Sequence, residues 1–206
     1  FRSWVRFCRI WGFSPRMYNY NNIQITMTQP DIQKLRYPIG DYSPKDNYSS
    51  DDLKWYINII ELFPAKIKQS VKGLNDKQLD TQYRDGGWTI RQVVHHVVDS
   101  HINSYTRFKL ALTEDNPAIR PYDEAMWAEL PEAKTGAVEL SIPLLEALHK
   151  RWVVMLKNIP AGQFDRKLYH PGSKSEMTIA SLLHLYAWHC DHHLAHITNL
   201  KKSNGW

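Results

Sequence analysis

The chain has 206 residues, a hydrophobic content of 43% and a formal net charge of +5. This length suffices for one well-buried domain and is short for two. No hydrophobic run approaches the roughly 18 residues of a transmembrane helix, and two distant cysteines, Cys8 and Cys190, argue against a disulfide scaffold. We therefore expect a soluble, cytoplasmic protein with no membrane partner.

The positive charge is concentrated at the start of the chain. Residues 1–26 contain four arginines and no acidic residue, so they supply +4 and leave +1 for residues 27–206. A nearly neutral body lacks the basic face that nucleic-acid binding requires, so no nucleic-acid partner is expected. Because Met27 resembles a natural start, we expect residues 1–26 to be a non-native or disordered extension and residues 27–206 to form one domain. A mitochondrial-type or membrane-surface arm is the alternative for residues 1–26.

The first amphipathic segment follows an irregular lead at residues 35–50. Apolar residues recur at helical spacing from Leu53 to Val71. Pro64 lies inside this pattern and should kink the helix, and Gly73 is placed to end it. The sequence therefore predicts a first helix from about Leu53 to Gly73.

The second helix has the clearest start signal. Residues 85–88 form a turn sequence, and Thr89 with Gln92 fits a capping box. The helical pattern continues to about Leu112. Beyond it, three prolines and Gly136 interrupt any regular pattern, which favours a long crossover that can cover a site.

Two further helices complete the pattern. The third ends before Pro160, and Thr178 is the expected N-cap of the fourth. The apolar pattern of the third consists of Leu144, Leu145, Leu148, Trp152 and Met155. No strand can be placed. Four amphipathic helices with one long connection predict an all-α fold, a four-helix bundle with a long crossover connection.

Four of the 10 histidines lie in two turns of the fourth helix. At about 100° per residue, His189, His193 and His196 fall within an arc of roughly 60°, with His192 on its flank. They stand on the apolar stripe that should face the core, where imidazoles need partners. A divalent metal satisfies several neutral imidazoles at once, and the i, i+4 pair His189 and His193 can reach one ion.

A third ligand should come from the second helix, which carries three more histidines. His96 borders the apolar stripe and begins a polar line of Ser100, Asn103 and Arg107, whereas His95 points about a quarter turn away. Taken singly, each histidine is more simply interpreted as a hydrogen-bonded core or surface residue. Their clustering favours a metal. The polar line fits a solvated helix face and a pocket lining equally well.

Several kinds of metal site are disfavoured because the sequence lacks their motifs. His-Glu-x-x-His, paired Glu-x-x-His and the zinc-deaminase motifs are absent, which argues against zincin, di-iron and deaminase sites. A mononuclear site with three imidazoles and open positions remains, and this is the pattern of catalytic zinc sites. Such an ion can activate a water or a thiol, so the residues alone do not choose between a hydrolase and a transferase.

Three further residues are candidates for catalysis. Asp99 and Ser100 lie within a turn of His96 and could orient a ligand or a nucleophile. His192 could do the same or act as an acid or base. An ordinary packing or surface role suits all three equally. Cys190 lies about 100° from His189 around the helix and is expected to pack as a thiol.

Four stretches of the sequence, at residues 35–42, 83–96, 117–124 and 186–197, carry a family resemblance. Together they resemble the YfiT group of metal-dependent hydrolases in the DinB-like superfamily. The resemblance spans nearly everything after Met27, and the length of these stretches makes it specific. Residues 1–26 have no counterpart in it.

The resemblance implies a four-helix bundle of the DinB-like type, often a homodimer, with one metal per chain. By motif position the ligands are His96, His189 and His193. Zinc, Zn2+, is the usual metal of this group, and nickel, Ni2+, is the alternative. Cys190 stands where the group has a smaller hydroxyl residue. Relatives are described as hydrolases or as transferases that use a low-molecular-weight thiol, notably bacillithiol.

Three functions remain open on these grounds. The first is a metal-dependent hydrolase-type enzyme that acts on a small-molecule substrate. The second is a bacillithiol S-transferase that delivers the thiol to an electrophile. The third is a non-catalytic metal-binding bundle, in which the histidines only stabilise the fold.

Overall fold

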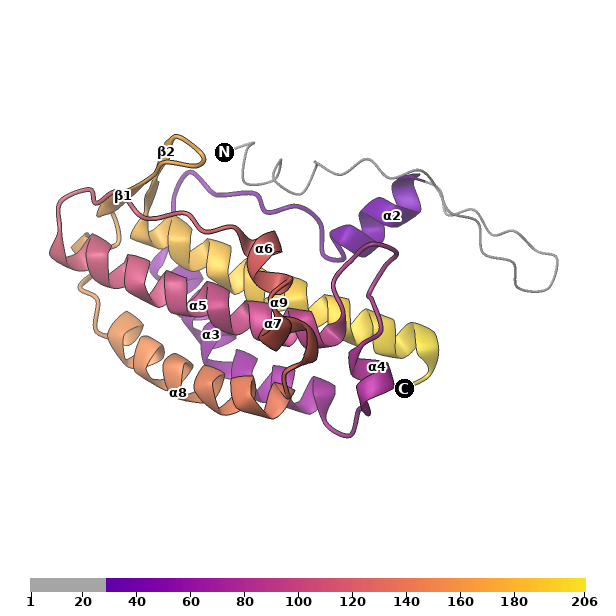
Figure 1. The fold of residues 1–206 in the computed structure, drawn as a ribbon. Coiled ribbons are helices and arrows are strands. Elements are labelled where there is room, and N and C mark those ends of the chain that lie inside the picture. The colour runs from indigo at the N-terminus through magenta and orange to yellow at the C-terminus, as the bar shows by residue number, and fades with distance from the viewer. Residues whose placement is uncertain (1–28) are drawn as a thin grey trace.

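The computed structural model describes residues 29–206, so the expectation for residues 1–26 lies outside the described part of the chain. Four long helices dominate the structure (Figure 1). They are α3 (Ser50–Val71), α5 (Ile90–Thr113), α8 (Val138–Lys157) and α9 (Ile179–Asn204). The four-helix prediction is therefore confirmed, and each helix lies where the sequence pattern placed it.

The helix starts follow from local hydrogen bonds. Thr89 accepts the backbone N–H of Gln92, and the Gln92 side chain accepts the backbone N–H of Thr89, which is the predicted capping box. Ser49 and Asp52 form the same arrangement at α3. Thr178 accepts the N–H of Ser181 at the start of α9, as predicted. These caps satisfy amide groups that the first turn of a helix leaves free.

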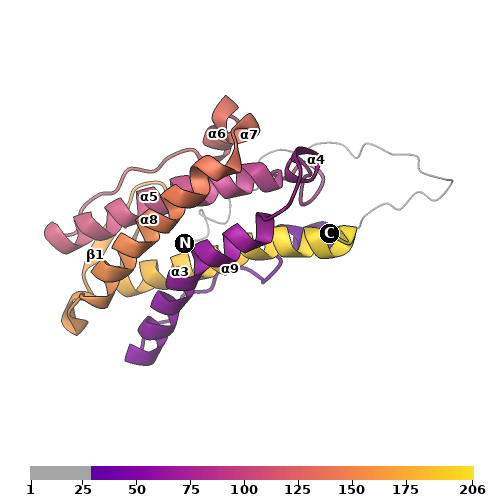
Figure 2. The same cartoon turned by 90° about the horizontal axis from the view of Figure 1, so that it is seen from below.

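The order in which the long helices pack differs from a simple up-and-down bundle. Both α3 and α5 pack mainly against α8 and α9. Consecutive long helices α3 and α5 therefore lie on a diagonal, as the two views in Figures 1 and 2 show. In an up-and-down bundle, successive helices are neighbours. Here α5 reaches α9 directly, and this contact brings the two histidine-rich segments together.

The connections contain more structure than the sequence indicated. The expected crossover between α5 and α8 includes α6 (Glu124–Ala128) and α7 (Pro131–Thr135), which pack on α5. Pro131 does not interrupt a helix but starts α7 from its first turn. The short helices α2 (Gln29–Arg36) and α4 (Asp76–Leu79) were not predicted either.

A small antiparallel hairpin accompanies the helices, where no strand was placed from the sequence. Strands β1 (Lys167–His170) and β2 (Ser175–Thr178) pair with Lys167 opposite Thr178, just before α9, and the 3-10 turn η2 (Ala161–Gln163) precedes them. Each strand has only four residues. Leu168 is the one hydrophobic residue of the two strands that is buried. Such short strands leave almost no periodic signal in a sequence.

The buried face of α8 is rotated from the predicted one. Leu144, expected in the apolar pattern, is 49% exposed, whereas Leu145 and Trp152 are fully buried. His149 lies between these two on the buried face and is 1% exposed. The core of the bundle therefore includes a histidine from α8 that the predicted apolar pattern did not contain.

Within residues 29–206, no helix combines the length and apolar character that crossing a membrane requires.

Candidate metal centre

Three histidines from two helices converge inside the bundle. His96 lies on α5, and His189 and His193 lie one turn apart on α9. One ring nitrogen of each lies within 4.8 Å of the others, and Nε2 of His96 is 3.3 Å from Nε2 of His189. None of the three side chains is more than 7% exposed. The structure thus brings together the three residues that the sequence selected as metal ligands.

Burial keeps these imidazoles neutral. Burial, together with the nearby His196, lowers the pKa of His96 to about 3. Burial also lowers the pKa of His189 and His193 well below the ordinary value, and neighbouring histidines add to the effect. A neutral imidazole keeps a lone pair on one nitrogen, which is the form that binds a metal. The three residues therefore fit a divalent ion in their chemistry as well as their positions.

The group consists of imidazoles alone. Among the described residues, no cysteine, aspartate or glutamate offers a fourth ligand atom within the same distance. Three protein ligands leave coordination positions open, as in catalytic zinc sites, whereas structural sites are closed by four. The set is therefore of the open type.

One wall of this group is Trp88. Its ring lies 4.5 Å from the ring of His96 and is stacked at 6.3 Å on that of His193, measured between centroids. Trp188 on α9 stacks instead on His192 at 4.3 Å. An aromatic wall excludes water from one side of the imidazoles and strengthens electrostatic interactions there.

A second cluster, made of His192, His193 and His196, overlaps the first at His193. Nε2 of His196 lies 3.2 Å from the carbonyl oxygen of Arg36, which can only accept, so His196 carries its proton on Nε2. Nδ1 of His196 then accepts from Nδ1 of His193, 3.4 Å away. The lone pair of neutral His193 is therefore on Nε2.

These hydrogen bonds favour the first cluster as the metal site. A neutral imidazole has a single lone pair, so His193 cannot serve ions in both clusters without losing its remaining proton. In the second cluster, the hydrogen bond between His193 and His196 already satisfies both Nδ1 atoms. In the first cluster, the Nε2 atoms of His96 and His189 face each other at 3.3 Å, so both can bind one ion.

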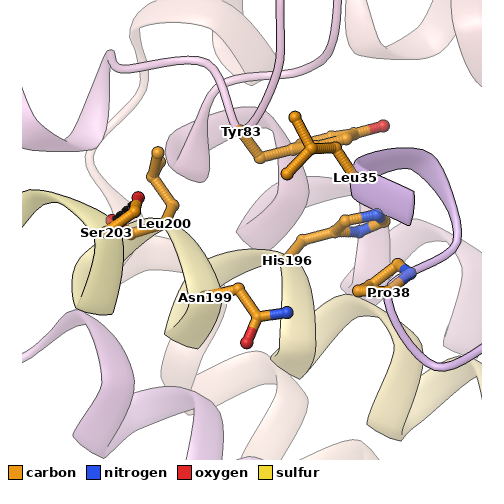
Figure 3. Close-up of a pocket in the computed structure, with 7 residues that line it drawn as sticks. All are labelled: Leu35, Pro38, Tyr83, His196, Asn199, Leu200 and Ser203. Atoms are coloured by element: carbon orange, nitrogen blue, oxygen red, sulfur yellow. Dashed lines mark hydrogen bonds between the residues drawn. The ribbon is translucent and has the colours of Figure 1, made fainter. Parts of the chain in front are cut away.

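The outer side of His196 is closed by the segment around α2 (Figure 3). The ring of Tyr83 stacks on that of His196 at 3.9 Å between centroids. The hollow beside them has a volume of only about 70 Å³ and is lined by Leu35, Pro38, Tyr83, His196, Asn199, Leu200 and Ser203. This volume is small beside the roughly 300–1,000 Å³ that is typical of ligand pockets.

A larger hollow lies where the crossover covers α5. Its volume is about 510 Å³, and its lining is Asn103, Arg120, Pro121, Tyr122, Asp123 and Trp127. Arg107 connects the rim to the bundle, since its guanidinium donates to the carbonyl of Arg120 and to the hydroxyl of Tyr186, each at 3.4 Å. The Tyr186 ring lies 5.5 Å from that of His189. The polar line of α5 is therefore buried against the crossover and is not a solvated face.

The candidate catalytic residues occupy three different surroundings. Ser100 is buried beside Tyr186, whose hydroxyl donates to the Ser100 carbonyl oxygen at 3.3 Å. Asp99 is half-buried, and burial together with the charge of Glu132 on α7 raises its pKa to about 6. His192 is buried, its Nδ1 has no hydrogen-bond partner, and burial lowers its pKa to about 3. Of the three, His192 lies directly against His193, with ring centroids 4.9 Å apart, and Ser100 contacts Tyr186, which lies beside His189.

Cys190 packs as the sequence predicted. It is fully buried within the hydrophobic core, and burial raises the pKa of its thiol. Neither histidine cluster includes it.

Two buried histidines that are linked to His189 by hydrogen bonds were not assigned from the sequence. His101 on α5 has Nε2 at 3.1 Å from Nδ1 of His189, and His149 on α8 has Nε2 at 2.7 Å from Nδ1 of His101. Both are at most 1% exposed. The available signal was their position on the apolar stripes of their helices, four residues after Val97 and Leu145 respectively.

The family model of the DinB superfamily matches residues 60–197, and the chain belongs to this superfamily.

Within that superfamily the chain is similar to a group of Bacillus proteins. It is 52% identical over 172 residues to the Bacillus subtilis (strain 168) protein named "Putative metal-dependent hydrolase YfiT", covering 84% of this chain and 97% of that protein. A Bacillus pumilus (strain SAFR-032) protein named "Putative metal-dependent hydrolase" is 47% identical, covering 85% and 99% respectively.

The solved structure of Bacillus subtilis YfiT supports the fold. It matches with a TM-score of 0.82 and 52% identity, over 84% of this chain and 99% of that one. That protein is described as "a probable metal-dependent hydrolase with an unusual four-helix bundle topology". In this chain, the diagonal placement of α3 and α5 departs from the simple up-and-down bundle.

Proposed function

We propose that this protein is a metal-dependent hydrolase in which His96, His189 and His193 hold one divalent ion. The observation that carries the proposal is the convergence of three neutral, buried imidazoles with no fourth protein ligand within residues 29–206. Three-ligand sites leave room for a reactant beside the metal. The names of the relatives support the same activity.

A bound ion would supply the positive charge that lowers the pKa of a water or a thiol to near neutrality. The residues of this chain orient and enclose the reactants. We assign the substrate to the hollow over Asn103, because Arg107 and Tyr186 connect its rim to His189. Ser100 is held by Tyr186 on this path and is the candidate to position a nucleophile.

Zinc is the ion that we propose, with nickel as the alternative, because neutral imidazole suits both. The test is metal content measured by mass spectrometry on the full chain purified without added metal. We expect about one ion per chain, and loss of most of it in each of the variants His96→Ala, His189→Ala and His193→Ala. Circular dichroism checks that helix content persists in each variant.

His95→Ala is the matched control. His95 neighbours His96 on α5 and is buried, but its nitrogens face Ser141 at 2.8 Å and the carbonyl of Gly136 at 3.1 Å. This variant should keep its metal. Little metal in the native protein, or full occupancy in all three ligand variants, would contradict the proposed site.

The reaction itself is tested by offering water alone or a low-molecular-weight thiol as nucleophile. Ester or amide hydrolysis that follows metal content and needs no thiol supports the hydrolase. Turnover of an electrophile only when a thiol such as bacillithiol is present would replace it with an S-transferase. Metal occupancy without either activity would favour a non-catalytic metal-binding bundle.

We further propose that the protein is a homodimer. Leu140, Leu144 and Val154 lie on one face of α8 and are 74%, 49% and 64% exposed, which supports an interface there. Light scattering on the native chain and on Leu140→Lys measures the mass. A native monomer would contradict the proposal, and a dimer that persists in Leu140→Lys would place the interface elsewhere.

A further inference from the structure

His149, His101 and His189 form a continuous line of hydrogen bonds through three helices. His149 Nε2 lies 2.7 Å from His101 Nδ1, and His101 Nε2 lies 3.1 Å from His189 Nδ1. At the far end, His189 Nε2 lies 3.3 Å from Nε2 of His96. The line therefore begins in α8, crosses α5 and ends inside the first histidine cluster.

The start of the line is a backbone carbonyl that Pro64 makes available. In a regular helix, the carbonyl of residue 60 would accept the N–H of residue 64. Pro64 has no N–H, so the Ile60 carbonyl in α3 lacks that donor. Nδ1 of His149 lies 2.7 Å from this oxygen.

The carbonyl fixes every proton along the line. A carbonyl oxygen only accepts, so His149 must carry its proton on Nδ1. Neutral His149 then accepts at Nε2, so Nδ1 of His101 must carry the proton that it donates. Neutral His101 accepts at Nε2 in turn, so Nδ1 of His189 must carry its proton. This is the only arrangement in which all three imidazoles are neutral and all three hydrogen bonds are formed.

We infer that His149 and His101 are positioning residues that set the tautomer of His189 and direct its Nε2 lone pair toward the metal position. This inference rests on the proposed metal-binding function. Metal-binding histidines commonly donate their second N–H to a carbonyl or carboxylate, which fixes the ring and strengthens the ligand. In this chain the acceptor is another histidine, and the fixed point is the Ile60 carbonyl two imidazoles away.

The tautomers are measured directly by 15N NMR of the histidine side chains in the metal-free full chain. Long-range 1H–15N correlations distinguish a protonated Nδ1 from a protonated Nε2. We expect His149, His101 and His189 all to carry the proton on Nδ1. A proton on Nε2 of His101 or His149 would overturn the inference, and this outcome does not depend on metal binding or on a variant that folds.

The effect on metal binding is measured by zinc competition with a chromophoric chelator. His149→Gln keeps a donor for Ile60 and an acceptor for His101, whereas His149→Leu keeps only the volume. We expect His149→Leu to weaken zinc binding by roughly 10- to 100-fold and His149→Gln by much less. Equal losses in the two variants, or no loss in His149→Leu, would overturn the inference.

His95→Gln controls for a general loss of stability. It removes a buried histidine of α5 that is hydrogen-bonded to Ser141 and Gly136 and is not in contact with the line. Its zinc affinity should stay within about threefold of native, because no partner of a proposed ligand is lost. Native protein that binds no zinc would refute the proposed metal site, while the NMR result would still decide the tautomers.

Discussion

At the scale of single residues, the surroundings of Asp99 disfavour the charged form of its carboxyl. Burial, and then the charge of Glu132, raises the pKa of its carboxyl to about 6. A raised native pKa means that the native state binds the proton more tightly than the unfolded chain. Ionisation of Asp99 between about pH 4 and pH 6 therefore lowers the free energy of unfolding.

The variant Asp99→Asn should therefore stabilise the protein at alkaline pH. We expect a gain of about 1–2 kcal/mol at pH 8, less than the full shift implies because the side chain is half-buried and partly screened. The gain should shrink as the pH falls from 6 to 4, since native Asp99 becomes protonated there. Urea denaturation at several pH values measures it.

The same variant separates structure from catalysis at this position. Asp99→Asn that keeps its metal but loses turnover would assign Asp99 a catalytic role. A loss of stability at pH 8 would contradict the raised pKa instead.

Sequence alone could select the three histidines of the candidate site but not the residues that support them. His189 and His193 stand one turn apart, and His96 starts a polar line, so both signals are local. His149 was missed because the predicted stripe of α8 included Leu144 and Leu148, which are respectively exposed and partly buried in the structure. Only the packing of α8 on α3 shows that His149 faces the Ile60 carbonyl.

At the scale of elements, the contribution of the α5 capping box to the free energy of unfolding can be measured. Thr89 and Gln92 exchange two hydrogen bonds at the N-terminus of the helix that carries His96. Thr89→Ala removes the side-chain acceptor and should cost about 1 kcal/mol of unfolding free energy. Urea denaturation should show a lower midpoint with an unchanged slope.

Thr106→Ala is the matched control on the same helix. Thr106 is exposed and its hydroxyl only donates to the Ile102 carbonyl, so the change should stay within about 0.5 kcal/mol. Equal costs at the two positions would show that the cap contributes nothing specific.

Near the same end of α5, Arg91 forms hydrogen bonds that connect α5 with α4 and with the end of α7. Its guanidinium is buried and donates to Asp80 and Asp76 at 2.7 Å and to the Gly136 carbonyl at 2.9 Å. Arg91→Met should cost about 2–3 kcal/mol, because it removes charge-assisted hydrogen bonds and leaves the carbonyl without this donor. Arg91→Lys should recover only part of this loss, since an ammonium cannot reach three acceptors in the same planar geometry. Full recovery in Arg91→Lys, measured by thermal unfolding, would contradict this account.

The elements that the sequence missed share a physical reason. Helices as short as α6 and α7 do not stabilise themselves in water, and they form here because they pack on α5. The strands β1 and β2 depend in the same way on their mutual pairing and on their contacts with α5 and α9. By contrast, the caps of α3, α5 and α9 are local hydrogen bonds, so their positions could be predicted from a few residues each.

At the scale of the whole molecule, the diagonal order of the long helices decides what the histidines can do. Sequence predicts four amphipathic helices but not which pairs pack, since each apolar face fits several partners. The observed order places α5 between α8 and α9, so that His101 can contact both His149 and His189. Neighbouring placement of α3 and α5 would be a different bundle with the same local pattern.

This concentration of neutral histidines should make the metal-free fold sensitive to acid. Burial lowers the pKa of His96 and His192 to about 3 and of His149 and His196 to about 4. A lowered native pKa means that the unfolded chain binds protons more tightly, so stability is present above about pH 6.5 and is lost as the pH falls below it. Each such histidine contributes a loss of up to about 1.4 kcal/mol per pH unit.

Protonation of the four histidines should therefore cancel a free energy of unfolding of about 5–15 kcal/mol within a few pH units. We therefore expect the metal-free chain to unfold near pH 5, although protonation of Asp99 opposes part of the loss. Zinc at about 1,000 times its Kd adds about 4 kcal/mol and should move the midpoint down by roughly one pH unit. Circular dichroism against pH, with and without zinc, measures both midpoints. A metal-free midpoint near pH 3, where carboxylates titrate, would contradict the buried neutral histidines. An unchanged midpoint with zinc would contradict the metal site.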